Sequence, residues 1–258
     1  MRFADWLALR EPADADARAV ELVEPVRRRL AGLDRPVIHD LGSGTGSMAR
    51  WLAPRLSGPQ HWGLYDRDPD LLARTSVPAP ATVETKVADI TRLTAADLAG
   101  ADLVTASALL DMLTAADVER IVAACAARPT LLTISVLGRA ELTPPDPLDA
   151  EVEAAFNAHQ RRTVDGRVLL GPDAVEATIA AFARHGVPVR TAPSPWRLGP
   201  DRAALAVEWF TGWLGAACEQ RPDLALPAEE YADRRLADAS AGRLNVVLHH
   251  QDLLAGCD

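Results

Sequence analysis

The sequence Val-Ile-His-Asp-Leu-Gly-Ser-Gly-Thr-Gly-Ser at residues 37–47 constrains the fold more than any other stretch of this chain. Its apolar first half predicts a buried strand, and the three closely spaced glycines predict a tight turn, because glycine adopts backbone conformations that other residues avoid. A helix then begins at Ser47, and its free N–H groups can donate hydrogen bonds to a ligand. This order of elements indicates an α/β fold with a nucleotide-type cofactor at the turn.

The acid before the turn narrows the kind of ligand. Asp40 lies two residues before Gly42, at the carboxyl end of the expected strand. A carboxylate there favours a cationic or hydroxyl-bearing ligand and repels a pyrophosphate. An NAD(P)-dependent oxidoreductase would also need a third glycine or alanine where this chain has Ser47, so this alternative fits less well. On this motif alone, a plain strand-to-helix turn also stays open.

The turn resembles the first motif of the class I S-adenosylmethionine-dependent methyltransferases: an acid, any residue, then Gly-x-Gly-x-Gly. The resemblance implies an α/β, Rossmann-like sheet of seven mostly parallel strands with flanking helices, and S-adenosyl-L-methionine as the cofactor. It also implies that Asp40 helps to position the cofactor. The turn itself would hold the methionine part of the cofactor through Gly42, Ser43, Gly44 and Gly46.

A second strand, predicted at residues 61–66, also ends in an acid. The resemblance implies that Asp66, followed by Arg67, binds the cofactor, since the carboxylate oxygens can accept hydrogen bonds from both ribose hydroxyls. The alternative is that Asp66 caps the next helix. Asp68, with Pro69 at the first helical position, is the better cap, which leaves Asp66 for the ligand.

Two further strands extend the pattern. The strand at residues 83–90 ends at Asp89 and Ile90, which the resemblance places at the adenine amino group and ring. A surface acid is the alternative for Asp89. The strand at residues 101–107 leads into a loop where cofactor and acceptor should meet, with Ser107 near the methionine end. Asp111 in this loop is a candidate for contacting the acceptor, because Thr114 is the better cap for the following helix.

Methyl transfer to a hydroxyl, amine or carbon can require a general base, and histidine is the side chain whose pKa lies nearest neutrality. His159 is the candidate base, because it lies in a helix predicted over residues 149–162, where this fold builds its substrate pocket. A solvated position on that helix is the alternative. His39, inside the first strand, is interpreted as a packed core histidine.

The second half of the chain departs from strand–helix alternation. Pro144-Pro145-Asp146-Pro147 interrupts the chain, and two helices are predicted near residues 202–219 and 228–239, before a last strand at residues 244–249. This pair is interpreted as an added helical cap, acting either as a lid or as a contact in a homodimer. Trp209 and Trp213 lie four residues apart on one face, a spacing typical of packing.

Composition bounds the remaining choices. A chain of 258 residues with 48% hydrophobic residues can bury one core, so we expect a single domain. Within it we distinguish an N-terminal helical segment (1–35), a cofactor-binding core (36–137), substrate-side helices (138–186) and the helical insertion (200–241). The three cysteines suit neither a disulfide framework nor a zinc site, and no metal is expected. The sequence shows no export or membrane signal, so a cytoplasmic location is expected.

The charge of the chain argues against a polyanionic partner. The net charge is −9 and the isoelectric point about 5.2, whereas nucleic-acid binders usually carry a basic surface. The sequence therefore predicts a methyltransferase acting on a small-molecule acceptor, with no nucleic acid or membrane partner. A catalytically silent, cofactor-binding regulatory partner and an NAD(P)-dependent oxidoreductase remain as alternatives.

Overall fold

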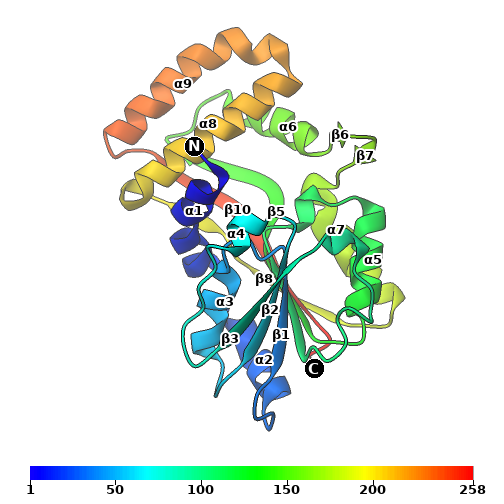
Figure 1. Ribbon diagram of the computed structural model, residues 1–258. Helices are drawn as coiled ribbons and strands as arrows, with labels where there is room; N and C mark the ends of the chain where they lie inside the picture. Colours follow the sequence, from blue (N-terminus) through cyan, green and yellow to red (C-terminus); the bar gives the residue numbers. More distant parts are fainter. Residues whose placement is uncertain (258) are drawn as a thin grey trace.

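The computed structural model describes residues 1–257 and is built around one mostly parallel sheet with the strand order β3-β2-β1-β4-β5-β10-β8 (Figure 1). Strands β1 to β5 run parallel, while β10 is antiparallel to β5, β8 and β9. The predicted class I methyltransferase sheet is therefore confirmed. The strands are β1 (Val37–Leu41), β2 (His61–Asp66), β3 (Thr82–Val87), β4 (Leu103–Ser107), β5 (Thr130–Thr143), β8 (Val189–Pro193), β9 (Trp196–Leu198) and β10 (Asn245–Ala255).

Helices cover both faces of the sheet, as a parallel sheet requires. One core lies between the sheet and helices α2 and α3, and a second lies between the sheet and helices α5 and α7 (Figure 1). These helices are α2 (Val23–Leu30), α3 (Ser47–Leu52), α5 (Ala115–Cys125) and α7 (Ala174–Arg184), and α4 (Pro69–Leu72) is a short turn of helix. Thr114 caps α5 through a capping box, as predicted.

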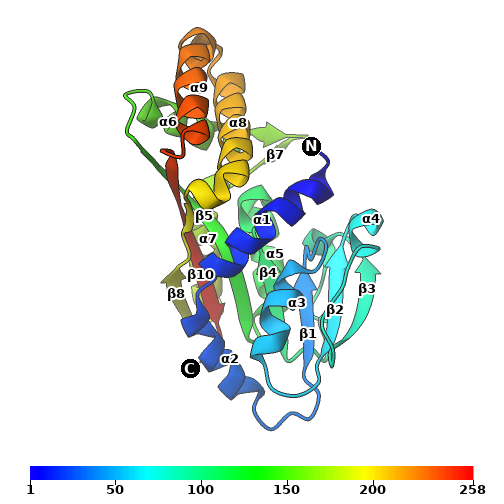
Figure 2. The same ribbon diagram turned by 90° about the vertical axis from the view of Figure 1, so that its left-hand side faces the viewer.

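Helix α1 (Phe3–Ala17) crosses the upper edge of the core, and Figure 2 shows it running obliquely between α3 and the cap. The helical cap itself consists of α6 (Asp149–Gln160), α8 (Ala203–Gln220) and α9 (Ala225–Ser240), with the small hairpin of β6 (Thr163–Val164) and β7 (Arg167–Val168) beside it. Phe210, Trp213 and Tyr231 are buried in a third core between these helices. Strands β5 and β10 extend beyond the sheet and connect it to the cap (Figure 1).

Short 3₁₀ helices complete the described chain: η1 (Val20–Leu22), η2 (Ala53–Arg55), η3 (Ile90–Arg92), η4 (Leu110–Met112), η5 (Gly171–Asp173), η6 (Pro200–Arg202) and η7 (Pro222–Leu224). None of the helices described over residues 1–257 combines the length and the apolar character that crossing a bilayer demands.

The N-terminal segment differs most from its sequence prediction. The helical segment expected over residues 1–35 forms two helices with a break between them, because α1 ends at Ala17 and α2 begins only at Val23. Between the two helices Arg18 leaves the helical conformation, and its side chain is buried in the protein interior. The last strand also continues past the predicted His249 to Ala255, because it pairs along its length with β5.

Candidate active site

A cavity of about 1520 Å³ lies beyond the carboxyl ends of the core strands and continues beneath the cap. Ligands of open α/β sheets bind at this edge. All the predicted site residues line the cavity except Gly46 and His159; those that do are Asp40, Gly42, Ser43, Gly44, Asp66, Arg67, Asp89, Ile90, Ser107 and Asp111. The fold thus brings acids from four separate strand ends into one site.

The glycine turn exposes its backbone to this cavity. Gly42 and Gly44 have φ values of +65° and +54°, which are strained for residues with a side chain. The N–H of Ser43 donates to the carbonyl oxygen of Tyr65 at 2.9 Å, so the turn is pinned to the end of β2. Gly46, with φ +86°, forms the N-cap of α3 and shapes the turn without lining the cavity.

Asp40 is a buried carboxyl group with one oxygen left unpaired. The hydroxyl of Thr105 donates to its Oδ1 at 2.7 Å, while Oδ2 has no hydrogen-bond partner among the described residues. Burial raises the pKa of Asp40 to about 7, against the opposing effects of the Thr105 hydrogen bond and the Arg18 charge. A cationic ligand group near Oδ2 would favour the ionised carboxylate.

Asp66 is oriented by the backbone on both sides. Its Oδ2 accepts the N–H of Gly44 at 2.8 Å and its Oδ1 accepts the N–H of Asp68 at 3.0 Å. The sequence prediction left Asp66 free of structural bonds, whereas the structure gives each oxygen one. Each carboxylate oxygen keeps a further lone pair that can accept a ligand hydroxyl. Asp68 caps α4 by accepting the N–H groups of Asp70 and Leu71, as predicted.

Asp89 and Ile90 lie at the outer end of the cavity. Asp89 is half exposed and accepts both the N–H (3.0 Å) and the hydroxyl (2.7 Å) of Thr91, so it caps η3. The Thr91 hydrogen bond holds the pKa of Asp89 below its usual range. Ile90 is buried beside it, and the exposed side chain of Arg67 borders the same part of the cavity.

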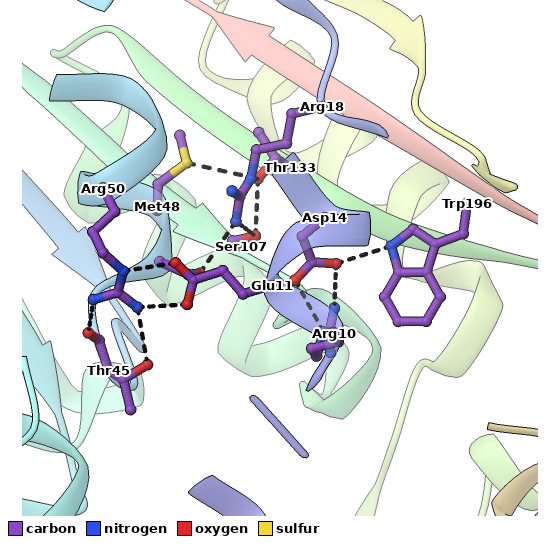
Figure 3. A network of polar contacts seen from close by, with 11 residues as sticks. Arg10, Glu11, Asp14, Arg18, Thr45, Met48, Arg50, Ser107, Thr133 and Trp196 are labelled. Atoms are coloured by element: carbon purple, nitrogen blue, oxygen red, sulfur yellow. Dashed lines mark hydrogen bonds and ion pairs between the residues drawn. The ribbon is translucent and has the colours of Figure 1, made fainter. Parts of the chain in front are cut away.

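A buried arginine behind the site was missed from the sequence. The Arg18 guanidinium donates to the hydroxyls of Ser107 (3.0 Å), Ser47 (3.3 Å) and Thr133 (3.4 Å), and its Nη1 finds no partner within the described chain (Figure 3). Burial lowers the pKa of Arg18 from its ordinary value. Ser47 and Ser107 line the cavity, so this positive charge lies directly behind its wall. No motif marks Arg18, because its partners are distant in the sequence.

Helix α1 closes one side of the cavity. Glu11 accepts hydrogen bonds from Nε and Nη2 of Arg50 at 2.6 and 2.7 Å, and Arg50 also contacts Thr45 in the glycine turn (Figure 3). Further along α1, Asp14 accepts hydrogen bonds from Arg10 and, at 2.9 Å, from the indole N–H of Trp196 on β9. The helix therefore links the turn to the cap side of the site.

The cap side of the cavity is aromatic, and Asp111, in η4 after β4, also lines the cavity. Little solvent reaches the Asp111 carboxyl, and this desolvation raises its pKa. No side chain within residues 1–257 donates a hydrogen bond to it or pairs with it. Together with Asn157 and Gln160, five aromatic side chains form what we call the acceptor wall: Trp6, Phe156, Trp196, Trp209 and Trp213.

The predicted base His159 lies elsewhere. Its Nε2 is 3.1 Å from a Glu219 carboxylate oxygen on α8, and its Nδ1 contacts Arg162, so the imidazole fills the junction of α6 and α8. The helix was predicted correctly, but the ring is on a different face from Asn157 and Gln160, which do line the cavity. His39 packs in the core against Tyr65, as interpreted from the sequence.

His250 is the buried histidine that does reach the cavity. Burial lowers its pKa to about 3, so the imidazole is neutral at pH 7, and its ring packs edge-on against Trp196. Over residues 1–257, no three His, Cys, Asp or Glu side chains are grouped so that they could hold a metal ion.

Comparisons with known proteins agree with this geometry. Residues 38–128 match a family model described as a methyltransferase domain. The chain resembles a solved putative type II methyltransferase from Anaeromyxobacter dehalogenans, at 14% identity and a TM-score of 0.51 over 93% of this chain and 96% of that one. It also resembles the cyclopropane synthase MmaA2 from Mycobacterium tuberculosis, at 15% identity and a TM-score of 0.50 over 92% and 83%. No curated protein sequence matches the chain.

The fold is that of the class I methyltransferases, and the match of residues 38–128 to a methyltransferase domain agrees with it. The chain carries the methyltransferase domain of this family over residues 38–128, which comprise β1 to β4 and the helices between them through α5. The match to a methyltransferase domain disfavours the oxidoreductase alternative.

Proposed function

We propose that this enzyme transfers a methyl group from S-adenosyl-L-methionine to a small-molecule acceptor bound against the acceptor wall. The observation that carries the proposal is the continuity of the cavity, which joins the glycine turn to the cap without a break. Its volume of about 1520 Å³ exceeds the ~300–1,000 Å³ typical of a site for one drug-sized ligand, so cofactor and acceptor fit together.

In this proposal the cofactor lies along the strand ends. The turn from Gly42 to Gly44 receives the methionine part, Asp66 accepts the ribose hydroxyls, and Asp89 and Ile90 receive the adenine. The unpaired Oδ2 of Asp40 supports this placement, since a buried carboxylate oxygen favours a nearby cationic group. Ser107, held by Arg18, lies where the cofactor and the acceptor meet.

The sulfonium of the bound cofactor supplies an activated methyl group. The residues of the cavity orient the acceptor, exclude water and accept a proton. Orientation alone can contribute about 7–11 kcal/mol to such a step. With the methyl group supplied in this way, the Asp111 carboxylate would accept the proton that the acceptor loses. His159 has no role in this proposal, because it does not line the cavity.

A small molecule is the class of acceptor that the charge and the site favour. The net charge of −9 opposes nucleic-acid binding, and the wall beneath the cap is a concave aromatic surface. A catalytically silent regulatory partner would share the same cavity, so turnover decides between the two.

Calorimetric titration with S-adenosylhomocysteine, with NAD and NADP in parallel, tests the proposal. We expect binding of S-adenosylhomocysteine alone, weakened roughly 100-fold by Asp66→Ala, since hydrogen bonds to charged groups contribute about 1.5–3 kcal/mol each. Asp70→Ala is the matched control, because Asp70 is exposed on α4 and does not line the cavity. Binding of a nicotinamide cofactor alone would contradict the proposal.

A further inference from the structure

The acceptor wall contains a ready-made stacking surface. Trp209 and Trp213, one turn apart on α8, stack with ring centroids 5.2 Å apart and planes 25° apart. Trp213 is buried and is backed by Phe156 at 6.5 Å, whereas Trp209 is partly exposed and lines the cavity. An aromatic ring with a rigid neighbour behind it offers its outer face to a further planar ring.

The other indole rings of the wall are already engaged. The guanidinium of Arg10 lies 5.1 Å from the ring centroid of Trp196 and 6.0 Å from that of Trp6. Asp14 holds Arg10 in this position through hydrogen bonds of 3.0 and 3.1 Å. A cationic acceptor that bound to these rings would be repelled by the positive charge of Arg10, so this part of the wall disfavours an ammonium group.

Two side-chain oxygens of the wall lack donors. Asn157 and Gln160 lie one turn apart on α6, and their Oδ1 and Oε1 atoms are buried without a hydrogen-bond partner in the described part of the chain. The amide nitrogen of Asn157 donates to the carbonyl oxygen of Gly138 at 2.6 Å, which fixes the oxygen on the opposite side. Both residues line the cavity, and each unpaired amide oxygen requires an N–H or O–H donor.

We infer that the acceptor is a planar aromatic compound bearing at least two hydroxyl or amino groups, which stacks on Trp209 and donates hydrogen bonds to Asn157 and Gln160. The inference rests on the proposed methyltransferase function. A stacking surface alone would also accept an alkyl chain, but an alkyl chain satisfies neither amide oxygen. A saturated polyol would satisfy the oxygens but would not stack.

Calorimetry with protein saturated by S-adenosylhomocysteine tests this with three bicyclic probes of similar size, and with 1-dodecanol as an alkyl-chain probe. The bicyclic probes are 2,3-dihydroxynaphthalene, the saturated decahydronaphthalene-2,3-diol, and 2,3-dimethoxynaphthalene, which has no O–H donor. We expect the first probe to bind at least tenfold more tightly than either of the others. Equal or tighter binding of the saturated diol, or tighter binding of 1-dodecanol, would overturn the inference.

Variants assign the contacts. Trp209→Leu is expected to weaken binding of 2,3-dihydroxynaphthalene about tenfold, with Trp209→Phe, which preserves a ring, losing less than threefold. Gln160→Met, which keeps length but removes the amide oxygen, should weaken the dihydroxy probe about fivefold and leave the dimethoxy probe unchanged. Unchanged binding of the dihydroxy probe to both Trp209→Leu and Gln160→Met would contradict the inference.

The two proposals fail in different ways. Loss of S-adenosylhomocysteine binding in the wild-type protein would remove the proposed function itself. Normal binding of S-adenosylhomocysteine, combined with no preference for the planar diol, would remove only the aromatic acceptor. Each variant is titrated with S-adenosylhomocysteine as well, so that an unfolded variant is recognised by loss of both affinities.

Discussion

The two ends of the cavity are built by different means. The cofactor end uses backbone N–H groups and acids at strand ends, and Asp66 is held there by two hydrogen bonds from the main chain. The acceptor end uses aromatic rings from α1, α6, β9 and α8 and two amide side chains from α6. The side-chain oxygens of these two amides are unpaired. The comparison teaches that the main chain already holds Asp66 at the cofactor end and leaves the Oδ2 of Asp40 for a ligand, whereas both unpaired amide oxygens of the acceptor end depend on a ligand for a partner.

The largest expected effect is a loss of turnover without a loss of cofactor affinity, caused by a substitution at the acceptor end. Asp111→Asn removes the proposed proton acceptor but keeps the size of the side chain, so turnover should fall by about 10²–10⁴-fold. Affinity for S-adenosylhomocysteine should stay within twofold. Turnover is measured as S-adenosylhomocysteine formed with 2,3-dihydroxynaphthalene as acceptor.

The control for Asp111→Asn is Asp165→Asn, on the turn of the β6–β7 hairpin, where the same chemical change borders the cavity at an exposed position. This control should turn over like the wild-type protein. An Asp111→Asn enzyme as active as the control would show that the acceptor loses its proton without Asp111.

A pH series sharpens the comparison at the cofactor end. The pKa of Asp40 is about 7 when folded against 3.8 for the free side chain, so the folded protein holds more protons between about pH 4 and 7, and stability falls as pH rises through this window. Cofactor binding favours the ionised form. Affinity for S-adenosylhomocysteine should therefore rise roughly tenfold from pH 6 to pH 8, as the ionised fraction increases.

The same titration on Asp40→Asn provides the control for the pH series. Asparagine cannot ionise, so the affinity of this variant should not change across the range. A wild-type affinity that is constant between pH 6 and pH 8, measured calorimetrically, would mean that Asp40 is not coupled to the cofactor.

A pair of glycine substitutions tests whether the turn acts through its conformation. Gly44 and Gly100 both have positive φ, +54° and +82°, and only Gly44 lines the cavity. Either residue replaced by alanine should lower the free energy of unfolding by about 1 kcal/mol, measured by urea denaturation. Only Gly44→Ala should weaken S-adenosylhomocysteine binding, by about threefold to tenfold. Equal affinities of the two variants would argue against a role for the turn.

The smallest effect is expected at His159. The imidazole pairs with Glu219 between α6 and α8, and an ion pair of this kind contributes about 0–1 kcal/mol. His159→Ala should leave turnover within twofold, measured under the conditions used for Asp111→Asn. A loss of turnover as large as that of Asp111→Asn would restore His159 as the base and place it at the acceptor end after all.

The sequence predicted which residues gather at the strand ends beside the cavity, because the signals for these residues are local. A glycine turn after an apolar strand and acids at successive strand ends can be recognised without knowing what lies opposite them. Arg18 could not be found in this way, since the residues that it bonds, Ser47, Ser107 and Thr133, come together only in the folded chain.

The acceptor end was less predictable, for two physical reasons. The sequence identified His159 as a histidine on a helix near the site. It does not show in which direction the face of α6 that carries His159 points. A helical segment was expected over residues 1–35, but the position of α1 beside the cavity was not, because its contacts are divided between the glycine turn, the cavity and Trp196 and so leave no single apolar stripe in the sequence.

Strands β5 and β10 tie the cap to the sheet as a hydrogen-bonded ribbon, paired from Thr130 with Ala255 to Thr143 with Asn245. Two strands bonded along their length resist flexing far more than a single linking segment would. The span between the methyl donor and the tryptophans of the cap is therefore a property of the ladder, fixed when the protein folds. Lengthening both strands by one residue pair would move the tryptophans of the cap by about 3.4 Å, so the length of this ribbon sets the size of acceptor that fits.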